Sequence, residues 1–456
     1  MSTASVSLPP ILSTLIGRIV AAVPSRARAT FLDLLIGAAV TKSGHVTDAI
    51  LAVGLSRSWT TYYWLLERGR WSWLRVWQAL LEVMTTLFAP PVWHVVIDDT
   101  VVERISARAP GSLIHHNHTN KPNRPRCVRG QGWLCLAAVI EWKVGAVPLM
   151  LRLVRRGTNR GKLKSARFLL RLLGTRLGHV RVLLDAWFMR GGLILCTVAD
   201  GHTVIGRVRR DLALYEVPKA PRRRGRPRKY GERLTRTKVE ALPVHRTAQI
   251  LSGNLEVVRD RTGLVAARFL KGAVVRAVWV ELERPDRRDK PRDERLLICT
   301  DLTLPAILVI TAYAKRWSVE PLFAAMKHGW GLKDAWQQSR QGLMRWVTLL
   351  AAGYALNQML AYTDPARIPG LADPAPWRPP GTRTAGLIQA GIARILRVVG
   401  RPAFSAAISP KIHAETGRGA GRSPPVTARA ASTVAADTIV PPTAVRFNTA
   451  DDRCCL

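Results

Sequence analysis

Two short apolar runs that end in aspartate constrain the fold of this chain more than any other feature of its sequence. The first is WHVVID (93–98), followed by Asp99, and the second is VRVLLD (180–185). Runs of this length, rich in Val, Ile and Leu, are typical of strands buried on both faces of a sheet. An acid at the carboxyl end of such a strand lies at the edge of the sheet, where sites form. We therefore expect a sheet that presents Asp99 and Asp185 at one edge.

The segments around these runs predict an α/β fold, with a mixed sheet flanked by helices. Strand-like runs lie at 133–142 and 146–154, which form a hairpin, at 202–208, and within a β-rich insertion at 254–259, 273–282 and 295–300. Helical patterns lie at 11–88, 160–178, 187–199, 304–328 and 342–362. After about residue 400 the sequence is rich in Ala, Pro, Thr, Ser and Gly without periodicity, which predicts a disordered tail.

The charge of the chain indicates a polyanionic partner. Lys and Arg number 69 against 31 Asp and Glu, which gives a formal net charge of +38. Nucleic acid is the commonest polyanion that such a surface binds. The longest apolar runs are well short of the roughly 18 residues that a membrane-spanning helix needs. We therefore expect nucleic acid, and no membrane, as the partner.

Two segments are candidates for nucleic-acid contact. Two helical runs separated by Gly54 predict a helix-turn-helix, with Ser56 as N-cap and with Arg57, Thr60, Thr61 and Tyr62 near base edges. The alternative is a plain helical hairpin with a Trp and Tyr core. The basic run 222–231 contains Arg224, Arg226 and Arg228, and its Arg-Gly-Arg-Pro resembles an AT-hook that inserts arginines into a narrow minor groove. The alternative is a generic basic linker that contacts any phosphate.

Cysteine and histidine give little support for a zinc site. Six cysteines are scattered without a CxxC pair, as in a cytosolic protein with reduced thiols. His115, His116 and His118 lie close together, but no cysteine pair stands at ligand spacing, and the nearby prolines mark a loop.

One helix carries the most specific pattern. The segment YAKRWSVEPLFAAMK (313–327) contains Tyr313, Arg316, Glu320 and Lys327. At about 100° per residue these four positions fall within one stripe about 60° wide on an α-helix. The alternative is a solvated salt-bridged face, because Arg316 and Glu320 are an i,i+4 pair.

The Tyr-(2)-Arg-(3)-Glu-(6)-Lys spacing resembles the signature of the bacterial DDE insertion-sequence transposases, and the order of the acids along 90–350 is similar too. The resemblance implies an RNase H-like catalytic domain in which Asp99, Asp185 and Glu320 are the catalytic and metal-binding triad. The family's first acid usually precedes a small or hydroxyl residue, which favours Asp99 over its neighbour Asp98 and leaves Asp98 open. The resemblance also implies that Tyr313, Arg316 and Lys327 contact the DNA of the element's ends.

We therefore expect a DDE transposase that binds insertion-sequence ends, cleaves DNA and joins 3′-ends to target DNA. The resemblance implies two Mg²⁺ ions, replaceable by Mn²⁺, a homodimer on double-stranded DNA, and a place at the nucleoid of the bacterial cytoplasm. The alternatives are a transposase-derived DNA-binding protein without catalysis, and an RNase H-like nuclease without strand transfer.

The expected organisation has six parts. They are a helical DNA-binding domain (1–88), the first part of the catalytic core (89–208), the β-rich insertion with its basic loop (209–300), the second part of the core with the Glu-bearing helix (301–365), a C-terminal helical region (366–400) and the tail (401–456).

Overall fold

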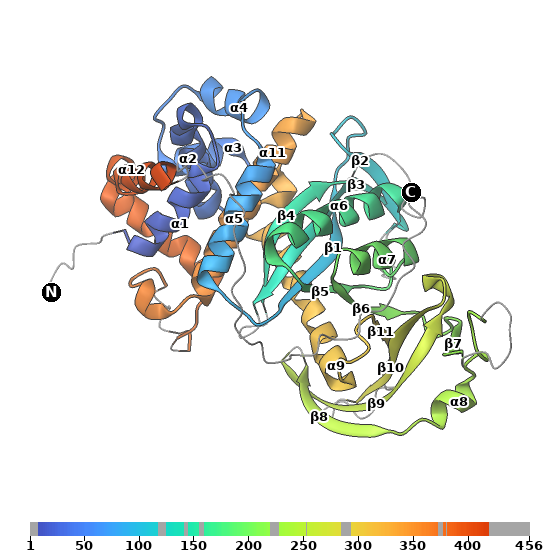
Figure 1. Cartoon of the computed structure of the whole chain (residues 1–456). Coiled ribbons are helices and arrows are strands. Elements are labelled where there is room, and N and C mark those ends of the chain that lie inside the picture. The colour runs from blue at the N-terminus through green and yellow to red at the C-terminus, as the bar shows by residue number, and fades with distance from the viewer. Residues whose placement is uncertain are drawn as a thin grey trace, which may run out of the picture.

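The computed structural model describes most of the chain and shows a mixed α/β architecture (Figure 1). The described residues are 8–116, 125–140, 145–154, 159–218, 228–251, 253–283, 293–372, 377–379 and 381–418. The strands are β1 (Trp93–Glu103), β2 (Ser112–His116), β3 (Cys127–Ile140), β4 (Gly145–Leu153), β5 (Val180–Leu184), β6 (Thr203–Val208), β7 (Leu214–Glu216), β8 (His245–Leu251), β9 (Asn254–Ala267), β10 (Ala273–Glu283) and β11 (Asp293–Cys299).

The helices lie at both ends of the chain and between strands. They are α1 (Pro10–Ala21), α2 (Ser25–Val40), α3 (Val46–Val53), α4 (Trp59–Glu67), α5 (Trp73–Leu87), α6 (Asn159–Leu177), α7 (Gly191–Ala199), α8 (Arg236–Glu240), α9 (Ala306–Ala314), α10 (Val319–His328), α11 (Arg340–Tyr362) and α12 (Ala385–Arg418).

The centre of the sheet consists of strands buried on both faces. β1 pairs antiparallel with β3 and parallel with β5, and β5 pairs parallel with β6. β3 and β4 form the expected hairpin. All five residues of the run 93–97 and four of the five in β5 are buried, which explains why both segments lack an apolar–polar alternation. This mixed sheet flanked by helices is consistent with an RNase H-like fold, as expected from the sequence.

The β-rich insertion continues the same sheet. β11 pairs antiparallel with β6, and the order β2-β3-β1-β5-β6-β11-β10-β9-β7 runs through an 11-stranded sheet of the described residues. β8 lies alongside β9. Figure 1 shows these strands curving away from the central strands as a separate lobe.

Helices cover both faces of the central strands. α6 packs on β3 and on α7, while α10 and α11 pack on β4, and α10 also contacts β1. Successive residues of a strand point to opposite faces. Neighbouring residues of β1 therefore face different helical layers.

The N-terminal helices pack against the C-terminal ones. α1 packs on α12, and α2 packs on α11. The indole N–H of Trp346 on α11 donates to the carbonyl of Gly44 (2.7 Å), and the Asn357 amide donates to the carbonyl of Ala39 (2.7 Å). The buried Asp33 of α2 accepts two hydrogen bonds from Arg401 of α12. The first helices are thus part of the helical layer that includes α11 and α12.

Gly44 and Gly331 bring two connections into backbone contact. A Cβ at Gly44 would lie 1.8 Å from the carbonyl oxygen of Gly331, and a Cβ at Gly331 would lie 1.8 Å from the backbone nitrogen of Gly44. Gly331 also has φ +64, a left-handed conformation that glycine adopts most readily. The connection between α2 and α3 is therefore held against the connection between α10 and α11.

Several expected boundaries differ from the structure, and three of them bear on the fold. β1 does not end at Asp98 but runs to Glu103, because its antiparallel pairing with β3 continues after the pairing with β5 has stopped. The helix expected from residue 187 begins at Gly191. Residues 401–418, expected in the tail, belong to α12, which bends at Gly400 (φ 74); residues 419–456 lie outside the described residues.

Arg345 on α11 fixes the end of α4. Its guanidinium donates to the carbonyls of Leu65, Leu66, Gly69 and Trp71, all of which are buried residues. We expect Arg345→Met to lower the free energy of unfolding by about 3 kcal/mol, because a buried acceptor without a donor costs about 1–3 kcal/mol. Urea unfolding followed by tryptophan fluorescence measures the change.

The matched control is Arg171→Ala, which removes the same charge from an exposed position on α6. It should change the free energy of unfolding by less than about 0.5 kcal/mol. Equal stabilities for the two variants would contradict the role assigned to Arg345.

Candidate active site

The register of β1 against β5 aligns two acids. The last parallel pair is Ile97 with Leu184, and the next residues are Asp98 and Asp185. Paired residues of neighbouring strands point to the same face of a sheet. Asp98 and Asp185 therefore lie on one face, beyond the last parallel pair, and Asp99 points to the other face.

Asp98 is a buried carboxylate with one close cation. Its Oδ2 accepts from a guanidinium N–H of Arg316 at 2.8 Å, and its Oδ1 accepts from the backbone N–H of Asp99. Burial, followed by the negative charge of Asp185, raises the pKa of Asp98 to about 7, against a smaller lowering by Arg316. The side chain is thus held where its charge is unfavourable unless a cation compensates it.

Asp99 has a different partner on the other face. Both of its carboxylate oxygens accept from the ammonium of Lys162 on α6, at 2.9 Å each. The same ammonium lies 4.0 Å from the ring centroid of Trp187. Asp99 was expected from the sequence to join Asp185 and Glu320, whereas in the structure Asp98 lies near Asp185 and Arg316. Lys162 lies within a basic helical segment, where nothing in the sequence distinguished it as a partner for Asp99.

Each residue of the 313–327 pattern interacts with the next one along the chain. Arg316 lies 6.0 Å from the ring centroid of Tyr313 and 4.0 Å from a carboxylate oxygen of Glu320. The pKa of Lys327 is lowered chiefly by burial, and the negative charge of Glu320 opposes this lowering. The segment is not one regular helix, because a 3₁₀ turn, η4 (Lys315–Ser318), separates α9 from α10. Tyr313, on α9, is buried, whereas the side chain of Glu320, on α10, is 46% exposed.

Asp185 and Tyr313 lie between the residues described above and the arginines of β6 and β11. Asp185 accepts a hydrogen bond from the backbone N–H of Phe188 at 2.9 Å, which orders the turn after β5. Burial raises the pKa of the Tyr313 phenol, and the charges that act on it include Asp185 and also Arg207 and Arg295. Arg207 on β6 and Arg295 on β11 were not singled out from the sequence, because only the pairing of these two strands brings them near Tyr313.

The acids fit a hard divalent cation. Among the described residues, no group of three or more His, Cys, Asp or Glu side chains lies close enough to hold a metal ion. However, Mg²⁺ usually takes only one or two protein carboxylates and completes its shell with water and phosphate oxygens. Asp98 and Asp185 provide such a pair, and a cation would relieve the repulsion that helps to raise the pKa of Asp98.

Some of the residues predicted to contact DNA from the helix-turn-helix are exposed and one is buried. Gly54, with φ 93, follows the last residue of α3 as its C-cap, and α4 begins at Trp59. Arg57 and Thr60 are exposed and Thr61 is partly exposed, as contact with DNA would require. Tyr62 is fully buried and hydrogen-bonds Asp33, so it cannot reach a base.

Ser56 does not cap α4, in contrast to the expectation. The N-cap position is Ser58, and the Ser56 hydroxyl instead donates to Asp33 at 2.8 Å. Near α4 the surface also carries large exposed side chains, including Trp59, Tyr63 and Trp64.

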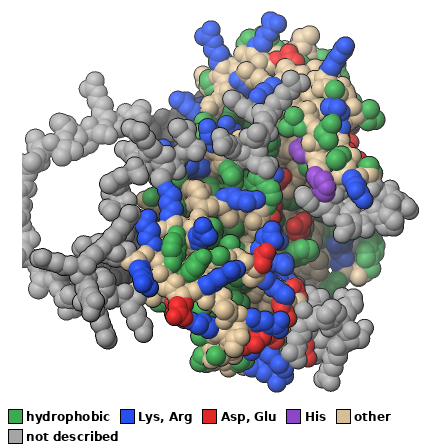
Figure 2. Space-filling model, turned by 90° about the vertical axis from the view of Figure 1, so that its right-hand side faces the viewer, with side chains coloured by type: hydrophobic (Ala, Val, Ile, Leu, Met, Phe, Trp, Pro, Cys, Tyr) green, Lys and Arg blue, Asp and Glu red, His purple; other side chains and the backbone are tan. Residues whose placement is uncertain are grey.

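The other basic and histidine candidates are only partly described. Arg228 is exposed, while Arg224, Arg226 and His118 lie outside the described residues. His115 and His116 lie on β2, and His115 contacts the carbonyl of Gly130. Figure 2 shows a face of the molecule where Lys and Arg side chains outnumber Asp and Glu and are spread over most of the described surface. None of the described helices is both long and apolar enough to cross a membrane.

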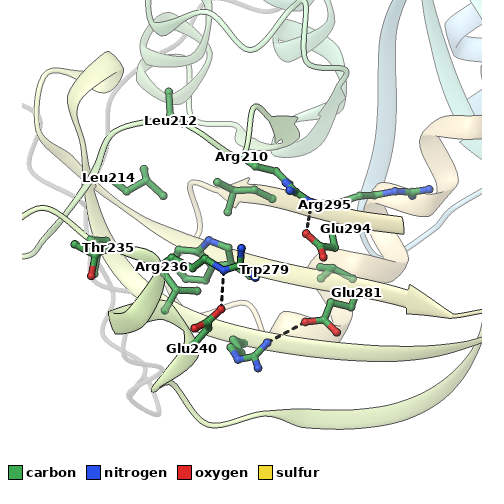
Figure 3. Close-up of a pocket in the computed structure, with 15 residues that line it drawn as sticks. Arg210, Leu212, Leu214, Thr235, Arg236, Glu240, Trp279, Glu281, Glu294 and Arg295 are labelled. Atoms are coloured by element: carbon green, nitrogen blue, oxygen red, sulfur yellow. Dashed lines mark hydrogen bonds and ion pairs between the residues drawn. The ribbon is translucent and has the colours of Figure 1, made fainter. Parts of the chain in front are cut away.

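A cavity of about 280 Å³ in the insertion lies apart from the paired acids (Figure 3). Trp279 is one of the residues that line the cavity. The charged residues of the lining pair with one another, as Arg210 does with Glu294 and Arg236 with Glu240. Its acids have arginine partners of their own, so this cavity offers no carboxylate pair for a cation like that of Asp98 and Asp185.

We expect Asp98→Asn to raise the melting temperature, and to raise it more at pH 8 than at pH 5. The folded protein retains the Asp98 proton up to its pKa of about 7, whereas the unfolded chain loses it near the ordinary value of 3.8. Wild-type stability therefore falls as the pH rises between these values and then levels off, and the variant lacks this loss. Thermal unfolding in EDTA should show a gain of about 2 °C or more at pH 8.

The control is Asp200→Asn, which changes an exposed carboxylate at the end of α7. It should show no comparable gain at either pH. A difference between Asp98→Asn and wild type that stays constant from pH 5 to pH 8 would contradict the burial of a charged Asp98.

Just over half of the chain matches the model of one protein family. The model of a family described as DDE superfamily endonuclease matches residues 20–252, just over half of the chain. The match includes Asp98, Asp99 and Asp185 and ends before the 313–327 segment. No curated protein matches the sequence. Because the match spans more than half of the chain and contains the paired acids, the protein belongs to the DDE superfamily endonucleases.

Proposed function

We propose that this endonuclease is an insertion-sequence transposase that cleaves DNA at the element's ends and joins the 3′-ends to target DNA. The observation that carries the proposal is the pair Asp98 and Asp185 beyond the last parallel pair of β1 and β5, with Arg316 and Glu320 beside it. We assign the triad as Asp98, Asp185 and Glu320. Asp99 is the weaker candidate, because Lys162 neutralises it on the opposite face.

The three acids would hold Mg²⁺, or Mn²⁺ in its place. When bound, two such ions activate a water or 3′-hydroxyl nucleophile and stabilise the leaving oxygen of an in-line displacement at phosphorus. Asp98 and Asp185 would hold the metal together, since they lie side by side on neighbouring strands. Water and a DNA 3′-end are alternative nucleophiles, so one site serves for cleavage and joining.

The surrounding cations would position the DNA. Arg316 and Lys327 provide positive charge on either side of Glu320, and guanidinium groups bind phosphate oxygens with two parallel hydrogen bonds. Tyr313 adds a phenol beside Arg316. Arg295, whose charge acts on Tyr313, extends this basic surface onto the insertion.

We further propose that α3 and α4 recognise the element's ends and that the protein acts as a homodimer, one copy for each end. The exposed Arg57 and Thr60 at the start of α4 support this role. The basic run that contains Arg224, Arg226 and Arg228 would add contacts to the minor groove or to phosphates.

We expect Asp98→Asn, Asp185→Asn and Glu320→Gln each to reduce cleavage by about 1,000-fold or more, since loss of one catalytic charge costs several kcal/mol of transition-state stabilisation. DNA binding should change little, because the carboxamide of Asn or Gln has the same shape as the carboxylate that it replaces. Gel assays of cleavage with Mg²⁺ and with Mn²⁺, beside binding titrations, make the comparison.

Asp99→Asn should be milder than Asp98→Asn, and Asp200→Asn should cleave as wild type does. Full cleavage by Asp98→Asn with none by Asp99→Asn would transfer the role to Asp99. If the wild type binds the ends but never cleaves, the protein is a DNA-binding derivative of a transposase.

We expect Thr60→Ala to reduce the preference for an element end over a scrambled duplex by about tenfold, as loss of a base contact costs about 1–3 kcal/mol of discrimination. Arg57→Ala should reduce it as well. Competition binding with a duplex from the inverted repeats that flank the gene measures the ratio of affinities.

Arg68→Ala is the matched control at the other end of α4, where the side chain is exposed. It should lower affinity for both duplexes alike. An unchanged ratio in Thr60→Ala and Arg57→Ala would argue for the plain helical hairpin. Deleting residues 1–88 is not a suitable test, because α11 and α12 would lose the helices they pack against.

A further inference from the structure

Building on the triad proposed above, we propose that Arg316 blocks the metal site in the free protein and that a DNA phosphate opens it by drawing the guanidinium away from Asp98. The block would couple metal binding to DNA binding. A carboxylate site that is complete only on DNA would keep the free enzyme inactive.

The contacts of Arg316 support the block. Its guanidinium donates to Asp98 on β1 at 2.8 Å and lies 4.0 Å from Glu320 on α10. It therefore lies close to two acids of the triad that come from different elements. The side chains of Arg316 and Asp98 are only 15% and 12% exposed. In so poorly solvated a position the attraction between opposite charges is strong, and Arg316 compensates part of the negative charge of Asp98.

A metal ion and Arg316 would compete for Oδ2 of Asp98. A bound Mg²⁺ would lie about 2.0–2.1 Å from a carboxylate oxygen, and the guanidinium nitrogen lies 2.8 Å from Oδ2 of Asp98. On the same oxygen the two cations would be separated by about 5 Å or less in a poorly solvated site, where they repel strongly unless DNA phosphates share their charge. Occupation of Asp98 by Arg316 and by a metal ion are therefore competing states.

The segment that carries Arg316 has the form of a hinge. η4 interrupts the helical run between α9 and α10, and a short 3₁₀ stretch within helix often marks a hinge. The residue after Arg316, Trp317, is 56% exposed, so one side of η4 faces solvent, where DNA has access. A phosphate offers the guanidinium two oxygens and replaces the carboxylate as its partner.

Binding of Mn²⁺ to the full-length protein, followed by the electron paramagnetic resonance signal of the free ion, tests the coupling. We expect Arg316→Ala to bind Mn²⁺ about tenfold more tightly than wild type without DNA, in the range of typical couplings between sites. A duplex with an inverted repeat that flanks the gene should raise the wild-type affinity by a similar factor and leave Arg316→Ala unchanged. Asp98→Asn with the same duplex corrects for Mn²⁺ on the DNA itself.

The matched control is Lys315→Ala, which removes a cation from the same 3₁₀ turn but on the side that lines a cavity with Trp93 and Pro91. Its Mn²⁺ affinity should equal that of wild type. If Arg316→Ala proves unfolded, the wild-type affinities with and without duplex still decide, and equal values would overturn the block.

The double variant Arg316→Ala/Asp98→Asn separates failure of the block from failure of the triad. If Arg316→Ala binds Mn²⁺ no more tightly than wild type and the double variant loses the ion, the block is wrong and the triad stands. If the double variant keeps the affinity of Arg316→Ala, the ion does not sit on Asp98, and both proposals fail.

Discussion

The parallel pairing of β1 with β5 determines the positions of the two paired aspartates in the candidate site. The pairing stops at Ile97 and Leu184, and Asp98 and Asp185 follow on the same face. Because side chains alternate along a strand, a slip of one residue would exchange the faces of Asp98 and Asp99. The observed register thus holds the two like charges of Asp98 and Asp185 on one face.

The burial of these strands on both faces explains what could and could not be predicted from the sequence. The central strands, the hairpin, three strands of the β-rich insertion and the position of Asp185 after its strand followed from short apolar runs and their lengths, whereas β2, β7 and β8 were not predicted. The choice between Asp98 and Asp99 did not follow from these runs, because a strand buried on both faces has no alternation that reveals which residue faces which side. Only the neighbouring strand and the partners Arg316 and Lys162, distant in sequence, separate the two acids.

The helix that carries Glu320 shows a second limit of sequence analysis. Ideal helical geometry placed Tyr313, Arg316, Glu320 and Lys327 on one stripe. In the structure Arg316 lies 6.0 Å from the ring centroid of Tyr313 and 4.0 Å from Glu320, across a break in the helix. The ideal geometry did not reveal η4, whose tighter turn accompanies the burial of Arg316 and the half-exposed position of Glu320. Packing against β1 and β4, which no local pattern encodes, sets these different environments.

The contact of Gly44 with Gly331 has a consequence for how such a protein changes its specificity over time. The connection before α3 touches the connection after α10, and α2 packs into the layer formed by α11 and α12. The recognition segment proposed above could not be exchanged between relatives as a detachable unit, because its replacement would have to fit the core of the protein. On that proposal, new preferences for element ends would arise by single substitutions on the exposed side of α4, with the buried side kept unchanged.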